Sequence, residues 1–162
     1  MKSLSPFTGY SRQKEEEVAA YWKKNKIKEK VQRQSAKAKK TFYLPDGPPY
    51  ATGHIHLGTA LNKVLKDVFY RSQRMQGFNV FDRAGYDSHG LPIENKVEKE
   101  LGFKSKEEIE RFGVKAFIEK CRAFATQYIE VMNNEFDNLG VWMDFENAYI
   151  TLENEYIESV WW

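Results

Sequence analysis

Two histidines and two glycines crowd one short stretch of the chain, PPYATGHIHLGTALNK, at residues 48–63. His54 and His56 stand just before an apolar-periodic run, and Gly53 and Gly58 bracket them. The first turn of a helix offers unpaired backbone N–H groups and a partial positive charge, so an anion can bind there when small residues leave the approach open. Neither G-x-x-x-x-G-K-[ST] nor G-x-G-x-x-G occurs, so this corner predicts a phosphate site of another type.

The same histidines could instead hold a metal ion. His54 and His56 are two residues apart, which places them on opposite faces of an extended segment. His89 and Cys121 are the further soft ligands, and no C-x-x-C pair occurs, so the spacing predicts no metal site. A metal-dependent hydrolase is the weaker alternative, and a structural role for both histidines stays open.

A second polar loop, YDSHGLPIE at residues 86–94, combines two carboxylates and an imidazole. Asp87, His89 and Glu94 follow an apolar segment that is typical of a parallel strand. Open α/β sheets bind ligands beyond the carboxyl ends of such strands. The alternative is a capped turn in which Asp87 is only a local hydrogen-bond acceptor.

These two loops need a strand, helix, strand unit to position them. Residues 41–44 predict a short strand that Pro45 ends, and apolar residues at helical spacing predict a long helix from Gly58 to a stop at Gly77. FNVFDRAG, at residues 78–85, predicts the second strand. A right-handed crossover between the two would make them parallel.

Further helical segments flank this unit. Residues 12–34 predict one helix, with acidic residues early and basic residues late. Ser105 and Glu108 have the spacing of a capping box for a helix that starts near Lys106, and residues 114–139 predict a longer helix. The fold class that follows is α/β with parallel strands and added helices.

Composition narrows the class of protein. Residues 1–40 hold 12 Lys/Arg against four Asp/Glu, although the whole chain carries only +2. We therefore treat residues 1–40 as a basic helical arm, which is either a solvated face or an attraction for nucleic acid. Mean hydropathy is −0.67, no apolar run could cross a bilayer, and the one cysteine cannot form an internal disulfide. We expect a cytoplasmic protein without a membrane partner.

Three separated segments resemble the class I aminoacyl-tRNA synthetases, in particular those specific for isoleucine. DGPPYATGHIHLGTALNKVLKD, at residues 46–67, resembles the first ATP-binding motif of that family and its flanks. AGYDSHGLPIE, at residues 84–94, resembles a segment of the amino-acid pocket, and residues 139–162 resemble the run toward the connective insertion. Valyl and leucyl relatives fit these segments less well and remain the alternative specificities.

The resemblance implies the first half of a Rossmann-like nucleotide-binding fold over residues 41–162, with ATP and Mg²⁺ as cofactors and isoleucine and tRNA(Ile) as partners. It implies no metal ligands on the protein. The residues it assigns to catalysis are His56, Gly58 and Thr59; those assigned to ATP are Gly53, His56, Gly58, Thr59 and Asn62; those assigned to the amino acid are Pro48, Tyr50, Asp87 and His89.

Two residues depart from the family's pattern. Thr59 stands where the motif usually has a second histidine, and Tyr86 stands where tryptophan is common. The family's second ATP motif, Lys-Met-Ser-Lys-Ser, does not occur, so the resemblance predicts a fragment of the catalytic domain. A non-catalytic nucleotide- or nucleic-acid-binding module is the alternative from a different class.

Overall fold

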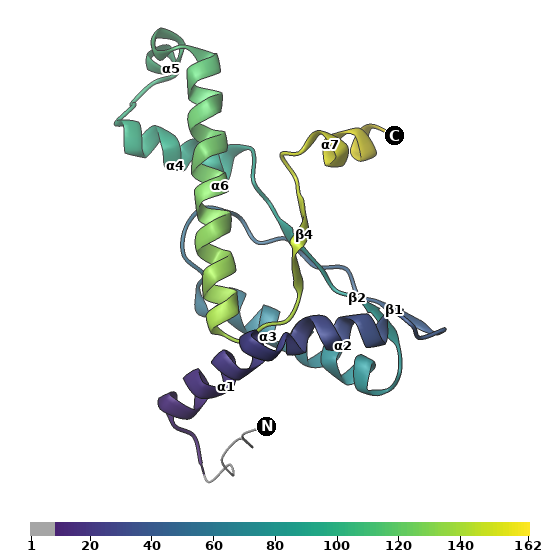
Figure 1. Cartoon of the computed structure of the whole chain (residues 1–162). Helices are drawn as coiled ribbons and strands as arrows, with labels where there is room; N and C mark the ends of the chain where they lie inside the picture. Colours follow the sequence, from purple (N-terminus) through teal and green to yellow (C-terminus); the bar gives the residue numbers. More distant parts are fainter. Residues whose placement is uncertain (1–8) are drawn as a thin grey trace. The chain divides into compact units, whose positions relative to one another are not determined.

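The structure, a computed structural model, describes residues 9–162. This part of the chain contains helices α1–α7 and strands β1–β4, in the order α1, α2, β1, α3, β2, β3, α4, α5, α6, β4, α7 (Figure 1). The described residues divide into two compact units. One comprises the chain up to Phe42 together with Tyr70–Phe81, and the other comprises Tyr43–Phe69 together with Asp82–Trp162. The sequence-based division at residue 40 stays a prediction.

The first unit begins with two helices, where the sequence predicted one. Ser11 caps α1, Arg12–Asn25, by accepting a bond from the Lys14 N–H at 3.2 Å, and α2 covers Ile27–Ser35. The prediction of a continuous helix over 12–34 is wrong because Lys26 adopts φ 50°, and its N–H closes α1 onto the carbonyls of Lys23 and Trp22. The periodicity missed this break, since Lys26 is neither glycine nor proline.

The predicted second strand is two strands in separate sheets. β1, Thr41–Tyr43, pairs with β2, Asn79–Phe81, and β3, Arg83–Tyr86, pairs with β4, Asp144–Ile150. Asp82 interrupts FNVFDRAG between β2 and β3. The long helix α3, Leu57–Met75, lies close to its predicted bounds and ends before Gly77, whose φ is 83°.

The second unit is built around β3. β3 and β4 are parallel, with Gly85 opposite Tyr149, and Tyr50 forms a parallel bridge to Asp87. The Asp87 N–H and C=O bond to Pro49 and Ala51, whereas the Tyr86 C=O accepts from the Thr151 N–H. The extension of β3 therefore lies between residues 49–51 and the end of β4. The parallel strands of the expected fold class are found here.

β4 was missed from the sequence. Its segment, DFENAYI, has a tyrosine and an isoleucine near its end but no strict alternation of apolar and polar residues. Its burial is mostly intermediate, with Glu146 and Asn147 exposed. Pairing with the buried strand β3 determines this strand more than its own periodicity does.

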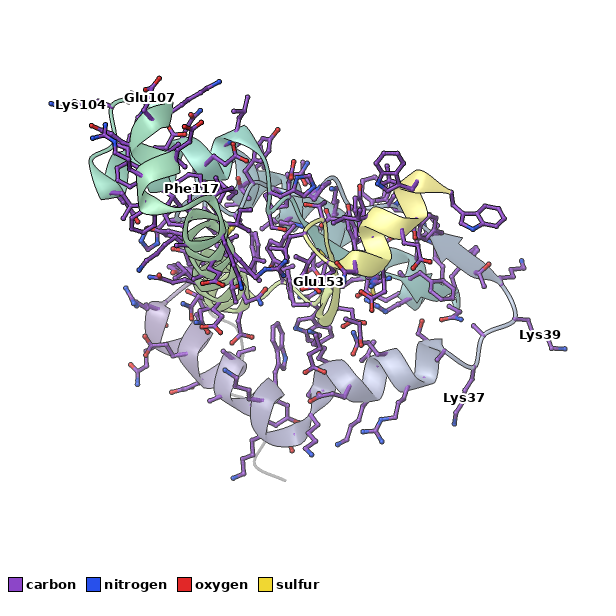
Figure 2. The ribbon with its side chains drawn as sticks, turned by 90° about the horizontal axis from the view of Figure 1, so that it is seen from above. Lys37, Lys39, Lys104, Glu107, Phe117 and Glu153 are labelled. Carbon is purple, nitrogen blue, oxygen red and sulfur yellow. The ribbon has the colours of Figure 1, made fainter. Side chains whose placement is uncertain are left out.

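Helices complete the second unit. α4, Leu91–Leu101, and α5, Lys106–Phe112, pack near the start of α6, Val114–Asn138, and α7 covers Asn154–Trp161 (Figure 1). Phe117 lies on the first turns of α6 beside α5 (Figure 2). The α6 residues in the core are Phe117, Phe124, Ala125, Ile129, Met132 and Phe136. No helix in residues 9–162 is long and apolar enough to cross a membrane.

The predicted capping box at α5 does not form, although the helix begins where it was expected. The helix starts at Lys106 as predicted, but the Ser105 side chain makes no capping bond. Instead the Glu108 carboxylate accepts from the Lys104 N–H at 2.6 Å. The Ser105 hydroxyl bonds Glu107, which lowers the pKa of that carboxyl.

Candidate functional site

A cavity of about 220 Å³ opens at the N-terminus of α3, in the second unit. Four of its seven lining residues were proposed from the sequence; the other three lie in the loop before α3 or in its second turn. The lining residues are Gly47, Pro49, His56, Gly58, Thr59, Asn62 and Lys63. The first N–H groups of α3 lie at this cavity, so it has the electrostatics of an anion site.

His56 caps the helix with its side chain. The Thr59 N–H donates to His56 Nδ1 at 3.2 Å, and His56 Nε2 lies 3.2 Å from Thr59 Oγ1. A backbone N–H can donate only to a ring nitrogen without a proton, so the proton of this imidazole is on Nε2. His56 lines the cavity, and both ring nitrogens contact Thr59, which orients the ring.

Gly58 packs closely against this ring. A Cβ added at position 58 would lie 3.0 Å from His56 Cε1 and 3.1 Å from Nδ1. A larger residue would therefore shift the exposed ring by a few tenths of an ångström. Gly58 therefore serves the placement of His56 as well as access to the helix terminus.

A buried charge cluster lies beside the cavity, and the sequence analysis did not predict it. The Asp46 carboxylate pairs with Lys63, bonds Lys66 at 2.6 Å and accepts from the Gly85 N–H at 3.0 Å. Lys63 is 1% exposed, and its burial lowers its pKa although Asp46 opposes that shift. Two ammonium groups share one carboxylate, which leaves an excess positive charge beside the cavity.

Asp46 joins three elements in this cluster. The Tyr149 hydroxyl of β4 donates to the Asp46 carbonyl, β3 contributes the Gly85 N–H, and α3 contributes both lysines. The available signal was Asp46 in PDGPP with lysines at 63 and 66, one helical turn apart. That spacing indicated a shared face but could not indicate burial.

The other histidine of this loop, His54, contacts α6 and does not line the cavity. His54 Nδ1 lies 2.6 Å from Glu135 Oε1, and the Ile55 N–H donates to Glu135 Oε2 at 2.9 Å. These contacts, first of all the Ile55 bond, lower the pKa of Glu135. Glu135 on α6 thus anchors the loop that leads into His56, which no sequence signal had linked to it.

Asp87 and Tyr50, both assigned to the amino acid by resemblance, are neighbours through their backbones. They form the parallel bridge at the carboxyl end of β3. Asp87 Oδ1 accepts from the Thr151 hydroxyl at 3.3 Å, and Thr151 also accepts from the Ser88 N–H at 2.9 Å. Asp87 is half-buried and its carboxylate is oriented by a neighbouring hydroxyl, as an acceptor for a cation requires.

Tyr86 fills the position that precedes this carboxylate. Its side chain is fully buried, its hydroxyl donates to Asn133 on α6, and burial raises its pKa. The tyrosine is thereby held by a specific polar contact from the longest helix.

His89 lines a different, larger cavity. This cavity measures about 400 Å³ and lies among α4, α6 and the residues around α7. Its lining is mainly apolar, with a few polar and charged groups. The lining residues are Ser88, His89, Gly90, Ile93, Glu94, Phe117, Ile118, Cys121, Arg122, Leu152 and Ile157.

The predicted residues therefore fall into groups. His56, Gly58, Thr59 and Asn62 converge on the smaller cavity, and Asp87 and Tyr50 meet at the β3 end. Gly53 and Pro48 are not among the residues that line either described cavity, so their assigned roles stay predictions. Within residues 9–162 no three His, Cys, Asp or Glu side chains are grouped as metal ligands would be.

The family of the chain follows from comparison with known proteins. Residues 17–162 match the family model of class I tRNA synthetases for isoleucine, leucine, methionine and valine, and the chain belongs to that family. Its fold also resembles the LeuRS of a ternary complex with tRNA and LeuAMS from Agrobacterium radiobacter K84. The TM-score is 0.64 at 25% identity, over 86% of this chain and 16% of that one.

Within the family, the chain is similar to isoleucine–tRNA ligases. It is 51% identical to that of Methanocaldococcus jannaschii over 100% of this chain and 15% of the relative. It is 54% identical to that of Methanoregula boonei and 51% identical to that of Pyrococcus furiosus, each over 91% of this chain and 14% of the relative. The chain thus spans about one seventh of the length of these relatives.

Proposed function

We propose that this chain provides the ATP-binding and isoleucine-binding part of an isoleucine–tRNA ligase. In the proposed reaction the carboxylate of isoleucine attacks the α-phosphate of ATP, giving isoleucyl-adenylate and pyrophosphate. A terminal hydroxyl of tRNA(Ile) then takes the isoleucyl group. The observation that carries the proposal is the cavity at the start of α3, which the His56 ring lines and beside which Lys63 and Lys66 share one carboxylate.

The ATP phosphates would bind at this cavity. Its donors would be the N–H groups around Gly58, the amide of Asn62 one turn later, and His56 Nε2–H, which would turn from Thr59 Oγ1 to a phosphate oxygen. The excess charge of the Lys63, Lys66 and Asp46 cluster favours the polyphosphate, since water is largely excluded from that cluster. Gly53 would allow the chain to approach the nucleotide, because nothing lies within 4 Å of a Cβ added there.

The isoleucine ammonium group would bind to Asp87. A carboxylate suits this role because it holds the cation and leaves the substrate carboxylate free to react. Pro48 and Tyr50 would form the adjoining wall of the amino-acid pocket. His89, which lines the larger cavity, would support the loop that carries Asp87.

Mg²⁺ fits this site only as an ion carried by the phosphates. Mg²⁺ in nucleotide sites binds carboxylates and phosphate oxygens. The cavity lining contains no carboxylate, and the Thr59 hydroxyl and the Asn62 amide are its side-chain oxygens. The ion would supply charge neutralisation on the phosphates.

Catalysis in this proposal comes from positioning and charge. No side-chain nucleophile is needed, because the substrate carboxylate is the nucleophile. His56 donates a hydrogen bond toward the charge that grows on the phosphate oxygens, without transferring a proton. Since the product serves protein synthesis, we place the protein in the cytoplasm.

Equilibrium binding by calorimetry tests the proposal with the full chain. We expect the chain to bind ATP, and we expect His56→Asn to lower the ATP affinity about tenfold. The fold should be kept, because asparagine can still cap α3. Asp87→Asn should weaken isoleucine binding and leave ATP binding unchanged. Isoleucine-dependent ATP–pyrophosphate exchange is the second readout.

Two results would contradict the proposal. One is ATP affinity that does not change in His56→Asn when circular dichroism shows a folded chain. The other is preference for leucine or valine over isoleucine, which would assign the chain to a different member of the family.

A further inference from the structure

The first unit carries a row of basic side chains that the proposed site does not use. Lys26, Lys30, Arg33 and Lys37 are spaced by four, three and four residues and are all exposed. At 3.6 residues per turn Lys30 and Arg33 lie on one side of α2, whereas Lys26 is its N-cap residue and Lys37 follows its C-cap residue. We call these four residues the basic row.

The opposite side of α2 faces its own unit. Ser35 lies about half a turn from the centre of the basic row, and its hydroxyl donates to the Phe78 carbonyl at 2.7 Å and accepts from the Val80 N–H at 3.3 Å. Ile27 and Val31 are half-buried on the flank of that side. The contacts with residues 78–80 therefore hold the basic row toward solvent.

The row is extended and is scarcely neutralised. Lys39 and Lys40 follow in the connection to β1 and are exposed, and Figure 2 shows Lys37 and Lys39 extending away from the ribbon. Glu29 is the one acid between residues 18 and 45. In the described part of the chain, the four residues of the row make no ion pair.

We propose that the basic row is a docking surface for the phosphate backbone of a structured RNA. Basic side chains at successive points along one element can neutralise phosphates, and phosphate contacts position a nucleic acid without reading its sequence. An acidic lipid surface is disfavoured because α2 places no large exposed apolar side chain beside the row. This proposal rests on the proposed function in one respect: the proposed function identifies the RNA as a tRNA.

The salt dependence of tRNA binding to the full chain tests the proposal. Four phosphate contacts predict a slope of log affinity against log salt of about −3. Lys30→Gln/Arg33→Gln should reduce the slope to about half and weaken binding about tenfold at low salt. Glu29→Gln removes a negative charge beside the row and should tighten tRNA binding. A folding defect could not produce tighter binding, so this variant separates lost contacts from misfolding.

Lys104→Gln/Lys106→Gln is the matched control. It removes the same charge from two exposed lysines at the start of α5, and tRNA affinity should be unchanged. Equal losses in both double variants would overturn the proposal, since net charge alone would then govern binding. Tighter binding to phosphatidylserine vesicles than to tRNA would overturn it as well. ATP affinity, measured in parallel, should be the same in all these variants, so failure of the basic row and failure of the proposed function are separable.

Discussion

The imidazole of His56 illustrates how one residue can shape both a helix and a site. Its Nδ1 accepts from the Thr59 N–H at the start of α3, and the same ring lines the cavity. Thr59 completes the arrangement with its hydroxyl at 3.2 Å from Nε2. Thr59 stands where the family motif usually has a second histidine. In this chain the threonine orients the ring of His56.

Gly58→Ala tests this arrangement. The new Cβ would displace the His56 ring, at a cost of about 1 kcal/mol in lost capping, while alanine in the helix would return about as much. We therefore expect an almost unchanged melting temperature and about tenfold weaker ATP binding. Leu61→Ala, on the exposed face of α3, is the control. A fully retained ATP affinity in Gly58→Ala would refute the role of the ring.

Cys121 provides a pH-dependent probe of the larger cavity. Burial, helped by the charges of Glu94 and Glu98, raises its pKa from 9.0 to about 11. Because the folded chain holds the proton more tightly than the unfolded chain, this group contributes stability below pH 9 and loses it as the pH rises toward 11.

The iodoacetamide alkylation rate of Cys121 should therefore be about 100-fold below that of an unstructured cysteine peptide at pH 8. It should rise about tenfold per pH unit and level off near pH 11. Mass spectrometry of the single-cysteine chain follows the reaction directly. A plateau that begins near pH 9 would show that the thiol is not shielded.

At the scale of elements, one carboxylate holds together the strand ends and the helix that form the candidate site. Asp46 follows β1 and reaches α3 through two lysines, β3 through Gly85 and β4 through Tyr149. β3 and β4 also meet closely, since a Cβ added at Gly85 would lie 2.1 Å from the Tyr149 ring. These contacts explain why short strands suffice to position the loops around His56 and Asp87.

Removing the Asp46 carboxylate should therefore lower the free energy of unfolding more than removing the Lys63 ammonium group. Asp46→Asn leaves the buried ammonium group of Lys63 and the partly buried one of Lys66 without a counter-charge, and we expect the free energy of unfolding to fall by about 3 kcal/mol. Lys63→Met removes a charge whose burial is unfavourable and leaves Asp46 bonded to Lys66, so we expect a loss below about 1 kcal/mol.

Urea unfolding of both variants measures this difference. Lys63→Met should still weaken ATP binding, because it removes the excess positive charge beside the cavity. Equal destabilisation by the two substitutions would mean that Asp46 does not act as a shared counter-ion.

At the scale of the whole molecule, the two compact units differ in how much apolar surface they bury. Neither α1 nor α2 contains a buried residue, whereas α6 contributes six. Local opening is easier where few apolar contacts must be broken. The first unit should therefore open well before the second.

Hydrogen exchange measures this difference. Amides in α1 and α2 should exchange at least 100-fold faster than the central amides of α6, and low urea should accelerate the former first. Exchange of all three helices at one common rate would indicate a single cooperative unit and contradict the expectation.

The order of the main helices and the placement of His56, Gly58, Thr59 and Asn62 could be predicted from the sequence, because apolar periodicity and a glycine-flanked helix start are local signals. The two loops at the strand ends were predictable for the same reason. The break at Lys26 was not, since no glycine or proline marks it. β4 was not predictable either, because it depends on a partner strand about 60 residues earlier.

Only the tertiary structure decided which distant side chains meet. Burial joins Asp46 to Lys63 and Lys66, and the packing of α6 brings Glu135 to the loop before His56, 80 residues away in sequence. Periodicity records which side of an element is apolar but carries no information on which charges share an enclosed space. The residue types of the site were therefore readable from the chain, and its electrostatics arose from folding.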